Sequence, residues 1–294
     1  MVNLETVMPD SAFPVDNLTR VTTVPELRTT VATLRQNGAR IAFVPTMGAL
    51  HEGHLTLVRQ ARALADKVVV SIFVNPLQFA PTEDLDRYPR NEAGDLAMLH
   101  SVGCDVVYLP TVDALYPKGF VSRIEMKGPA LGLESDFRPQ FFSGVATVVM
   151  KLFNQVRPDI ALFGEKDFQQ LAVIRAMVRD FDMPIEIVPG ATVREADGLA
   201  LSSRNAYLSP EERVIAPLLH QALQSVRTAV LAGDAPDATL ARAQSDLLAA
   251  GFRTVDYIAL RDAETLGDVT PGRPQRLLAA LWLGKTRLID NISV

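Results

Sequence analysis

The sequence predicts an α/β protein in which a doubly wound, mostly parallel sheet precedes a smaller C-terminal α+β domain. Three observations predict it. Short apolar runs alternate with segments of helical spacing through the first two thirds of the chain, as in repeated β-α-β units. The chain has 294 residues, which exceeds the usual size of a single core and favours a large domain plus a small one. After about residue 190 the chain changes to Ala-rich helices followed by strands.

The parallel sheet is predicted from short β-branched or aromatic runs, each bounded by Pro, Gly or charge, which is the pattern of buried strands. We expect these strands at residues 41–45, 68–75, 105–110, 160–163 and 185–188. Apolar residues at helical spacing predict helices between them, at residues 52–65, 91–102, 144–156 and 168–181. This order is typical of a Rossmann-like fold, which binds ligands at the carboxyl ends of its strands.

The C-terminal third is predicted to hold two helices and an antiparallel sheet. The helices are expected at residues 210–232 and 238–250, and the strands at 255–260, 276–283 and 287–292. The predicted division of the chain is a loose arm at 1–20, a Rossmann-like domain at 21–190 and a smaller domain at 191–294. The last of these can cover the ligand site as a lid.

Composition and charge exclude several classes of protein. The net charge of −5 argues against duplex DNA or tRNA as main partner, because proteins that track phosphate backbones carry basic surfaces. The single cysteine, Cys104, cannot form an internal disulfide and favours a reducing cytoplasm. Residues 1–20 lack the pattern of a signal peptide, and no window reaches the roughly 20 apolar residues of a membrane span. We expect a soluble cytoplasmic protein.

The first candidate site is residues 45–54, PTMGALHEGH, which follow a predicted strand and lead into a helix. Such a turn presents unpaired backbone N–H groups and the positive end of a helix dipole to an anion. Gly48 and Gly53 let the backbone approach phosphate, while His51 and His54, spaced i and i+3, donate to it. Two alternatives stay open here: a helix start with two surface histidines, and a zinc pair without a third ligand nearby.

Two further segments carry donors for phosphate. Residues 201–205, LSSRN, bring two hydroxyls, a guanidinium and an amide, which suits the far end of a triphosphate. Residues 163–170, FGEKDFQQ, again join a strand to a helix; Lys166 would supply positive charge, and Asp167 would cap the helix or orient ribose or Mg²⁺. The alternative for this segment is an ordinary joint with a salt-bridged lysine. Together the segments suggest chemistry at a nucleotide α-phosphate, where donors must be fixed in advance.

Two glutamines, Gln78 and Gln170, lie near predicted strand ends and suit a neutral, hydrogen-bonding pocket for a small hydroxy acid. The run 141–149, FFSGVATVV, would wall that pocket with apolar bulk. Each also has a plainer interpretation, because a turn glutamine is normally solvated and a valine stripe normally belongs to a core.

Four segments in order resemble the pantoate–β-alanine ligases, a family of the nucleotidyltransferase superfamily with an H-x-G-H motif. They are residues 45–54, 71–79, 164–170 and 193–205, and the resemblance covers nearly the whole chain after the arm. It implies that pantoate attacks ATP to give pantoyl adenylate and pyrophosphate, after which β-alanine attacks the acyl carbon and releases AMP. It also implies Mg²⁺ as cofactor and a homodimer; charge and hydropathy, as given above, argue against a nucleic-acid or membrane partner.

The resemblance implies roles for single residues. His54 stands where such enzymes carry a residue described as a proton donor, and Gln78 and Gln170 resemble the pantoate-binding pair, with Gln78 also near β-alanine. The implied ATP contacts are Met47, Gly48, His51, Gly53, His54, Gly164, Glu165, Lys166, Asp167, Val193, Leu201, Ser202, Ser203 and Arg204. The implied catalytic group is His51, His54, Lys166, Ser202, Ser203 and Arg204, the last four on the phosphate tail. The metal ligands are not marked in the sequence.

Two positions depart from the family pattern: Leu201 stands where Met can occur, and Phe168 where Tyr occurs; both keep apolar bulk. Pyrophosphate and AMP leave as anions, so we expect His54 to act chiefly as a hydrogen-bond donor at the α-phosphate. Three other functions agree less well with the sequence. Another nucleotidyltransferase would want more basic residues around a phosphate acceptor, a non-catalytic module would bind ATP without exchanging pyrophosphate, and the acidic balance disfavours an aminoacyl-tRNA synthetase.

Overall fold

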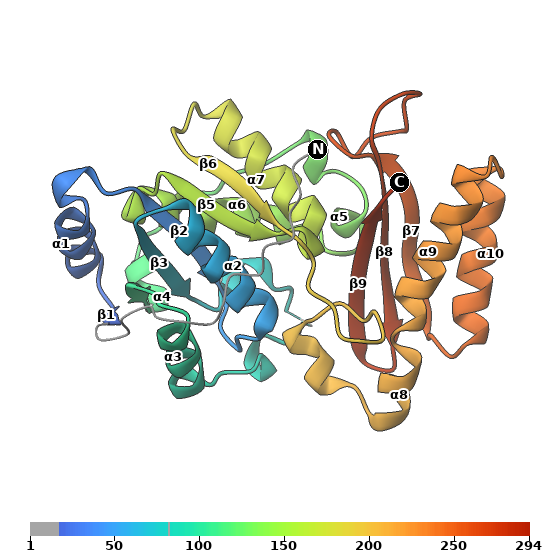
Figure 1. The fold of residues 1–294 in the computed structure, drawn as a ribbon, viewed down its shortest axis with the longest axis horizontal. Helices are drawn as coiled ribbons and strands as arrows, with labels where there is room; N and C mark the ends of the chain where they lie inside the picture. The colour runs from blue at the N-terminus through green and yellow to red at the C-terminus, as the bar shows by residue number, and fades with distance from the viewer. Residues whose placement is uncertain (1–17, 82) are drawn as a thin grey trace.

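The computed structural model describes residues 18–81 and 83–294, which form two sheets with their helices (Figure 1). The larger sheet has the strand order β1-β4-β3-β2-β5-β6, and its paired strands run parallel. The smaller sheet is antiparallel, in the order β7-β8-β9. The predicted fold class, a doubly wound α/β sheet with a smaller C-terminal α+β domain, is confirmed. Among the described residues, every helix is too short or too polar to cross a bilayer.

The larger sheet contains all the strands predicted for it, with ends shifted by a few residues. Its strands are β1 (Thr19–Val21), β2 (Ile41–Thr46), β3 (Lys67–Ile72), β4 (Val106–Tyr108), β5 (Ile160–Gly164) and β6 (Glu186–Gly190). Its helices are α1 (Val24–Leu34), α2 (Glu52–Leu64), α3 (Glu92–Ser101), α4 (Val112–Leu115), α5 (Glu134–Phe137), α6 (Phe141–Val156) and α7 (Phe168–Asp180).

The N-terminal strand β1 and helix α1 were not predicted. The expected arm at 1–20 lies mostly outside the described residues; its last two residues, Thr19 and Arg20, belong to β1, which pairs with β4. Helix α1 begins with a capping box, in which the side chains of Thr23 and Glu26 bond reciprocally to backbone N–H groups.

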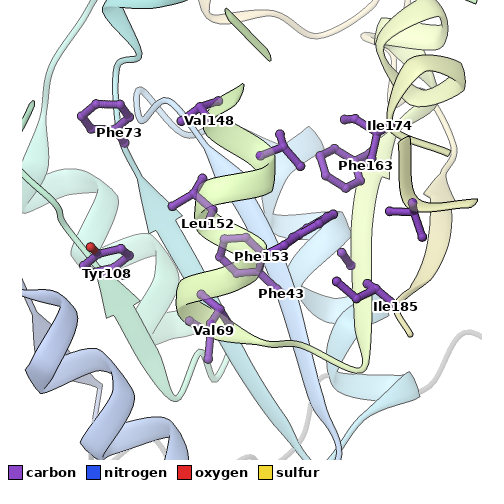
Figure 2. Close-up of a cluster of buried hydrophobic side chains, with 14 of the residues drawn as sticks. Phe43, Val69, Phe73, Tyr108, Val148, Leu152, Phe153, Phe163, Ile174 and Ile185 are labelled. Carbon is purple, nitrogen blue, oxygen red and sulfur yellow. The ribbon is translucent and has the colours of Figure 1, made fainter. Parts of the chain in front are cut away.

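Helices cover both faces of the parallel sheet because successive side chains of a buried strand point to opposite faces. On one face, α1, α6 and α7 pack on a core that includes Phe43 and Val69. Figure 2 shows Leu152 and Phe153 of α6 among the side chains of this cluster. On the other face, α2 and α3 pack on the alternate residues, such as Val44.

The order of the strands sets the place of a ligand site. From β2 the chain continues to β3 and β4 on one side, whereas β5 and β6 lie on the other side of β2. The loops that leave the carboxyl ends of β2 and β5 therefore diverge, and such a switch point leaves a crevice between them. The predicted site residues His51, His54 and Lys166 lie at these two connections, His54 in the first turn of helix α2.

The C-terminal domain consists of α8 (Pro210–Ile215), α9 (Leu218–Leu231), α10 (Pro236–Ala249), β7 (Thr254–Asp262), β8 (Gln275–Leu283) and β9 (Thr286–Ser293). Its sheet stands between the first domain and helices α9 and α10 (Figure 1). The prediction of one helix over residues 210–232 was wrong. The segment breaks at Ala216 and Pro217 because proline has no N–H to continue the helical hydrogen bonds.

Candidate active site

A cleft of about 1050 Å³ lies where the carboxyl ends of β2 and β5 face the C-terminal domain. The predicted site residues that line it are Met47, His51, Gly53, His54, Gln78, Gly164, Lys166, Asp167, Gln170, Val193, Leu201, Ser202, Ser203 and Arg204. Gly48 and Glu165 do not line it. The fold thus brings residues of the segments 45–54 and 201–205, which are predicted to bind phosphate and lie about 150 positions apart in the chain, into one cavity.

The loop after β2 is held by a buried carboxylate that the sequence reasoning missed. Gly48 has a φ of 82°, which favours glycine, and a Cβ there would lie 2.9 Å from Cγ2 of Ile72. Asp95 of helix α3 accepts the N–H groups of Ala49 and Leu50, at 2.9 and 2.8 Å. Burial raises the pKa of Asp95, and the two N–H bonds act in the opposite direction. Gly48 therefore shapes the loop, and Asp95 fixes it.

The two histidines cap helix α2 with their rings. Nδ1 of His51 accepts the N–H of Gly53 at 3.2 Å, and Nδ1 of His54 accepts the N–H of His51 at 3.3 Å. A neutral imidazole that accepts at Nδ1 carries its proton on Nε2. The ring centroids are 4.1 Å apart, and both rings line the cleft. The helix start thus selects the tautomer that donates from the far side of each ring.

The surroundings keep both rings uncharged at neutral pH. Burial lowers the pKa of His51 to about 4, and the charge of Lys166 contributes in the same direction. Burial also lowers the pKa of His54 to about 3, followed by the effects of His51 and Lys166. The cleft therefore offers neutral N–H donors next to a lysine.

We expect the imidazole NMR signals of His51 and His54 in the free protein to titrate near pH 4 and pH 3, not near 6.5. A bound triphosphate should raise both pKa values, because its negative charge stabilises the imidazolium form. Since the folded pKa values are the lower ones, the unfolded chain binds more protons below pH 6.5. The contribution of the two neutral histidines to the free energy of unfolding is therefore complete above pH 6.5 and falls as the pH drops toward 4. The loss of an imidazole signal in His51→Gln or His54→Gln assigns that signal to its residue. Titration midpoints near pH 6.5 would contradict the expectation.

Lys166 lies at the carboxyl end of β5, on the short 3-10 helix η5 (Glu165–Asp167). Its side chain lines the cleft and is 20% exposed, with Nζ 4.0 Å from Oδ1 of Asp167. The neighbouring Glu165 turns away from the cleft toward Arg276, with 3.5 Å between Oε2 and Nη2. Glu165 thus belongs to the joint with the C-terminal domain, while Lys166 faces the cavity.

The downstream segment meets the first domain across the cleft. Ser202 caps the 3-10 helix η6 (Ser203–Tyr207), accepting the N–H of Arg204 at 3.3 Å. Oγ of Ser203 lies 3.2 Å from Oη of Tyr88. The Nε and Nη2 atoms of Arg204 donate to Asp84 at 3.2 and 3.1 Å. Burial lowers the pKa of Arg204, but the bonds to Asp84 outweigh it and the net shift is upward. An anion that binds this guanidinium must therefore compete with Asp84.

Gln78 is buried and fixed by a polar network, rather than solvated as an ordinary turn glutamine would be. Its Nε2 donates to Sδ of Met47 at 3.1 Å, and its Oε1 accepts from Nδ2 of Asn75 at 3.1 Å. Asn75 in turn accepts from Oη of Tyr116 at 2.8 Å. Gln170 lines the cleft, and among the described residues its amide has no hydrogen-bond partner. One amide is therefore held in place, while the other is available to a ligand.

Gly144 of helix α6 lies against the backbone that carries Gln78, and we expect Gly144→Ala to displace it. A Cβ would lie 2.3 Å from O of Leu77 and 2.7 Å from N of Gln78. Alanine gains about 1 kcal/mol of helix propensity, but overpacking backbone against backbone costs about 1–3 kcal/mol or more. We predict that Gly144→Ala lowers the melting temperature and weakens the binding of pantoate, the ligand that the family resemblance implies for Gln78. Gly267→Ala, where a Cβ meets only Oγ1 of Thr265 at 3.4 Å, is the control and should change neither. Unchanged pantoate binding in Gly144→Ala would contradict the assignment of Gln78 to the pantoate pocket.

Comparisons with known proteins agree with one another. The family model described as pantoate-beta-alanine ligase matches residues 19–293. A pantothenate synthetase of Mesorhizobium japonicum is 55% identical over 274 residues, which cover 93% of this chain and 97% of the relative. The structure of pantothenate synthetase from Thermus thermophilus is 47% identical with a TM-score of 0.86, over 94% of this chain and 99% of that one. Pantoate-beta-alanine ligase from Francisella tularensis, complexed with beta-gamma ATP and beta-alanine, is 34% identical with a TM-score of 0.81, over 94% and 97%.

Proposed function

Because the chain belongs to the pantoate–β-alanine ligase family, we propose that the cleft between its two domains is where its substrates are activated and joined. The enzyme condenses (R)-pantoate with β-alanine to pantothenate, through pantoyl adenylate, and releases pyrophosphate and AMP. One observation supports the proposed location above all. The same cavity is lined by the neutral imidazoles of His51 and His54, by Lys166 and by residues 202–204.

In the first step a carboxylate oxygen of pantoate bonds to the α-phosphorus of ATP, and the bond from that phosphorus to pyrophosphate breaks. Negative charge then builds on the α-phosphoryl oxygens, so donors that are already oriented lower the barrier. We assign this role to the Nε2–H groups of His51 and His54, because their Nδ1 atoms are occupied by backbone N–H groups. Lys166 adds the positive charge that offsets the two anions.

The remaining contacts follow from the lining of the cleft. We assign the β- and γ-phosphates to Ser202, Ser203 and Arg204, with Arg204 leaving part of its pairing with Asp84. The rest of the nucleotide would lie against a second group that also lines the cleft: Met47, Gly53, Gly164, Asp167, Val193 and Leu201. Gly48 and Glu165 are assigned to loop shape rather than to contact, since neither lines the cavity.

The pantoate pocket is assigned to Gln78 and Gln170. Their amides can bind the hydroxyl and carboxylate groups of pantoate, while its methyl groups would pack on apolar side chains that line the cleft, such as Phe141 and Val145. In the second step the amine of β-alanine bonds to the acyl carbon near Gln78, the bond to AMP breaks, and the amine loses a proton. No side chain is assigned as the base.

His54 acts in this scheme as a hydrogen-bond donor and not as an acid. A ring whose pKa is about 3 is almost wholly neutral at pH 7, so it has no extra proton to release. Its N–H still stabilises charge on the phosphoryl oxygens. The role therefore needs a neutral ring with a fixed tautomer, which is what burial and the helix cap provide.

Mg²⁺ is proposed as the cofactor, carried mainly by the phosphates of ATP. Among the described residues no group of three or more His, Cys, Asp or Glu side chains could hold a metal ion. This fits Mg²⁺, which keeps several waters and uses one or two carboxylates besides the substrate phosphates. Asp167, which lines the cleft with its side chain 47% exposed, is the carboxylate we assign to it. When bound, the ion would screen the charge of the departing pyrophosphate.

We also propose an oligomeric state, a cellular compartment and a domain division for the enzyme. The family resemblance favours a homodimer, and Val121, an apolar residue that is 91% exposed, is a position that a second copy could cover. The single cysteine, Cys104, favours a reducing cytoplasm. We further propose that residues 21–190 and 191–294 are separate domains. Their separate apolar cores support this division.

Exchange of labelled pyrophosphate into ATP, run without β-alanine, tests the proposed function. We expect label in ATP only when pantoate is present, because the exchange requires reversible formation of pantoyl adenylate. A nucleotide-binding module would give no exchange at all. A transferase for another acceptor would exchange with a phosphorylated acceptor instead. Either of these two results would refute the proposal.

A further inference from the structure

Asn291 of strand β9 holds the loop that carries Lys166. Its Nδ2 donates to the carbonyl oxygens of Glu165 and Lys166, at 2.9 and 2.8 Å. Its Oδ1 accepts from Nε of Arg276 at 2.7 Å. The side chain is buried. Its neighbours set the orientation of the amide, because a flipped amide would place Oδ1 against two carbonyls and Nδ2 against the guanidinium. The polar groups of this side chain are thus committed to one geometry.

The preceding residue, Asp290, holds the second phosphate-binding segment. Its carboxylate accepts two hydrogen bonds from Arg194, at 2.6 and 2.8 Å. Arg194 also donates to the carbonyl of Gly198 at 3.0 Å and forms a bridge with Ala200. The turn fixed in this way leads directly into residues 201–204. Asp290 is as deeply buried as Asn291.

Strand β9 therefore links two segments that are far apart in sequence. Asp290 and Asn291 are adjacent and pair with Ala279 and Leu278 of the central strand β8. One side chain holds the segment 193–205, and the other holds the loop at 165–167. The distance between the segment 193–205 and the loop at 165–167 is consequently set by one step of a paired strand, which is stiff compared with a loop.

We infer that Asn291 is a positioning residue for adenylation. From its place in the C-terminal domain, it fixes Lys166 relative to the segment 193–205, which Asp290 holds. The inference rests on the proposed function, in which Lys166 stabilises the reacting phosphates. The amide of Asn291 is already engaged by the loop and by Arg276, so no contact with pantoate is assigned to it. Its loss should thus act on the rate of the first step and leave the binding of pantoate intact.

The test is pyrophosphate exchange by the full-length enzyme with Asn291→Ala. We expect kcat to fall between about tenfold and about a hundredfold, as for a group displaced by around 1 Å. The KM for pantoate should stay within about twofold. Asn154→Ala is the matched control, because Asn154 is exposed and donates only to Met150 of its own helix. It should retain the wild-type rate.

A double-mutant cycle with Lys166→Ala separates positioning from general damage. If Asn291 acts through Lys166, its removal in a Lys166→Ala background should lower kcat by less than about threefold. Equal losses in both backgrounds, or a wild-type rate for Asn291→Ala, would overturn the inference while leaving the proposed function intact. A wild-type rate for Lys166→Ala would overturn the inference and the role assigned to Lys166, while the exchange itself would still support the proposed function.

A second variant covers the case in which Asn291→Ala does not fold. Arg276→Met removes the guanidinium that orients the amide of Asn291, and with it the contacts of that guanidinium with the ring of Phe168 and with Glu165. We expect a smaller loss of kcat, about threefold to tenfold, that also disappears in the Lys166→Ala background. Circular dichroism at the assay temperature verifies folding. A loss that persists without Lys166 would count against the inference.

Discussion

Replacing His54 with alanine is expected to slow adenylation by about a hundredfold to a thousandfold while weakening ATP binding only a few fold. In the proposed scheme, Nε2–H of His54 donates to charge that develops in the transition state, whereas Lys166 and residues 202–204 also hold the ground-state triphosphate. Rapid-quench measurement of pantoyl adenylate gives the rate of the step, and calorimetry with ATP gives the affinity.

Two comparisons sharpen the His54 experiment. His100→Ala, at an exposed position of helix α3, should leave both quantities unchanged. His54→Gln retains an amide donor and should recover part of the rate. Since His54 also accepts the N–H of His51, the melting temperature of each variant must be measured. Equal losses in adenylation and in ATP affinity would mean that His54 only binds the substrate.

Replacing Lys166 with alanine is expected to slow adenylation by a similar factor, about a hundredfold or more. The carboxylate of pantoate and the α-phosphate repel each other, and a partly buried ammonium offsets this repulsion more strongly than one in water. The rate is measured by rapid quench, as above. Lys118→Ala, at an exposed position, is the control and should retain the wild-type rate.

The Lys166 variant also has an electrostatic readout that a loss of packing would not produce. Lys166 lowers the pKa of both His51 and His54, so its removal should move their NMR titration midpoints upward from about 4 and about 3. Burial remains the larger cause, and both values should stay below 6.5. Unchanged midpoints combined with an unchanged rate would remove Lys166 from the site.

The sequence was sufficient for elements whose signal is local. Buried strands such as residues 41–45 were found because a parallel sheet buries both faces and gives continuous apolar runs. Strand β1 was missed because three residues carry too little pattern. The helix break at Pro217 was visible in the sequence and was outweighed by the helical spacing on either side of it. The order of the strands within the sheet could not be obtained from local pattern.

The candidate site was predictable only where its groups belong to short motifs. His51, His54, Lys166 and residues 202–204 stand in such motifs, and they do line one cleft. Asp95 and Asn291 were missed because each acts on a loop more than 40 positions away, through contacts that tertiary structure alone creates. The tautomers of the histidines were equally out of reach, since they depend on which backbone N–H groups the rings accept.

A crystal structure with a non-hydrolysable ATP analogue shows whether the histidines of helix α2 and the donors at residues 202–204 hold a single triphosphate. We predict the α-phosphate within hydrogen-bonding distance of Nε2 of His54, with the β- and γ-phosphates against Lys166 and residues 202–204. A nucleotide bound elsewhere, or one whose phosphates contact only one of the two groups, would contradict the account.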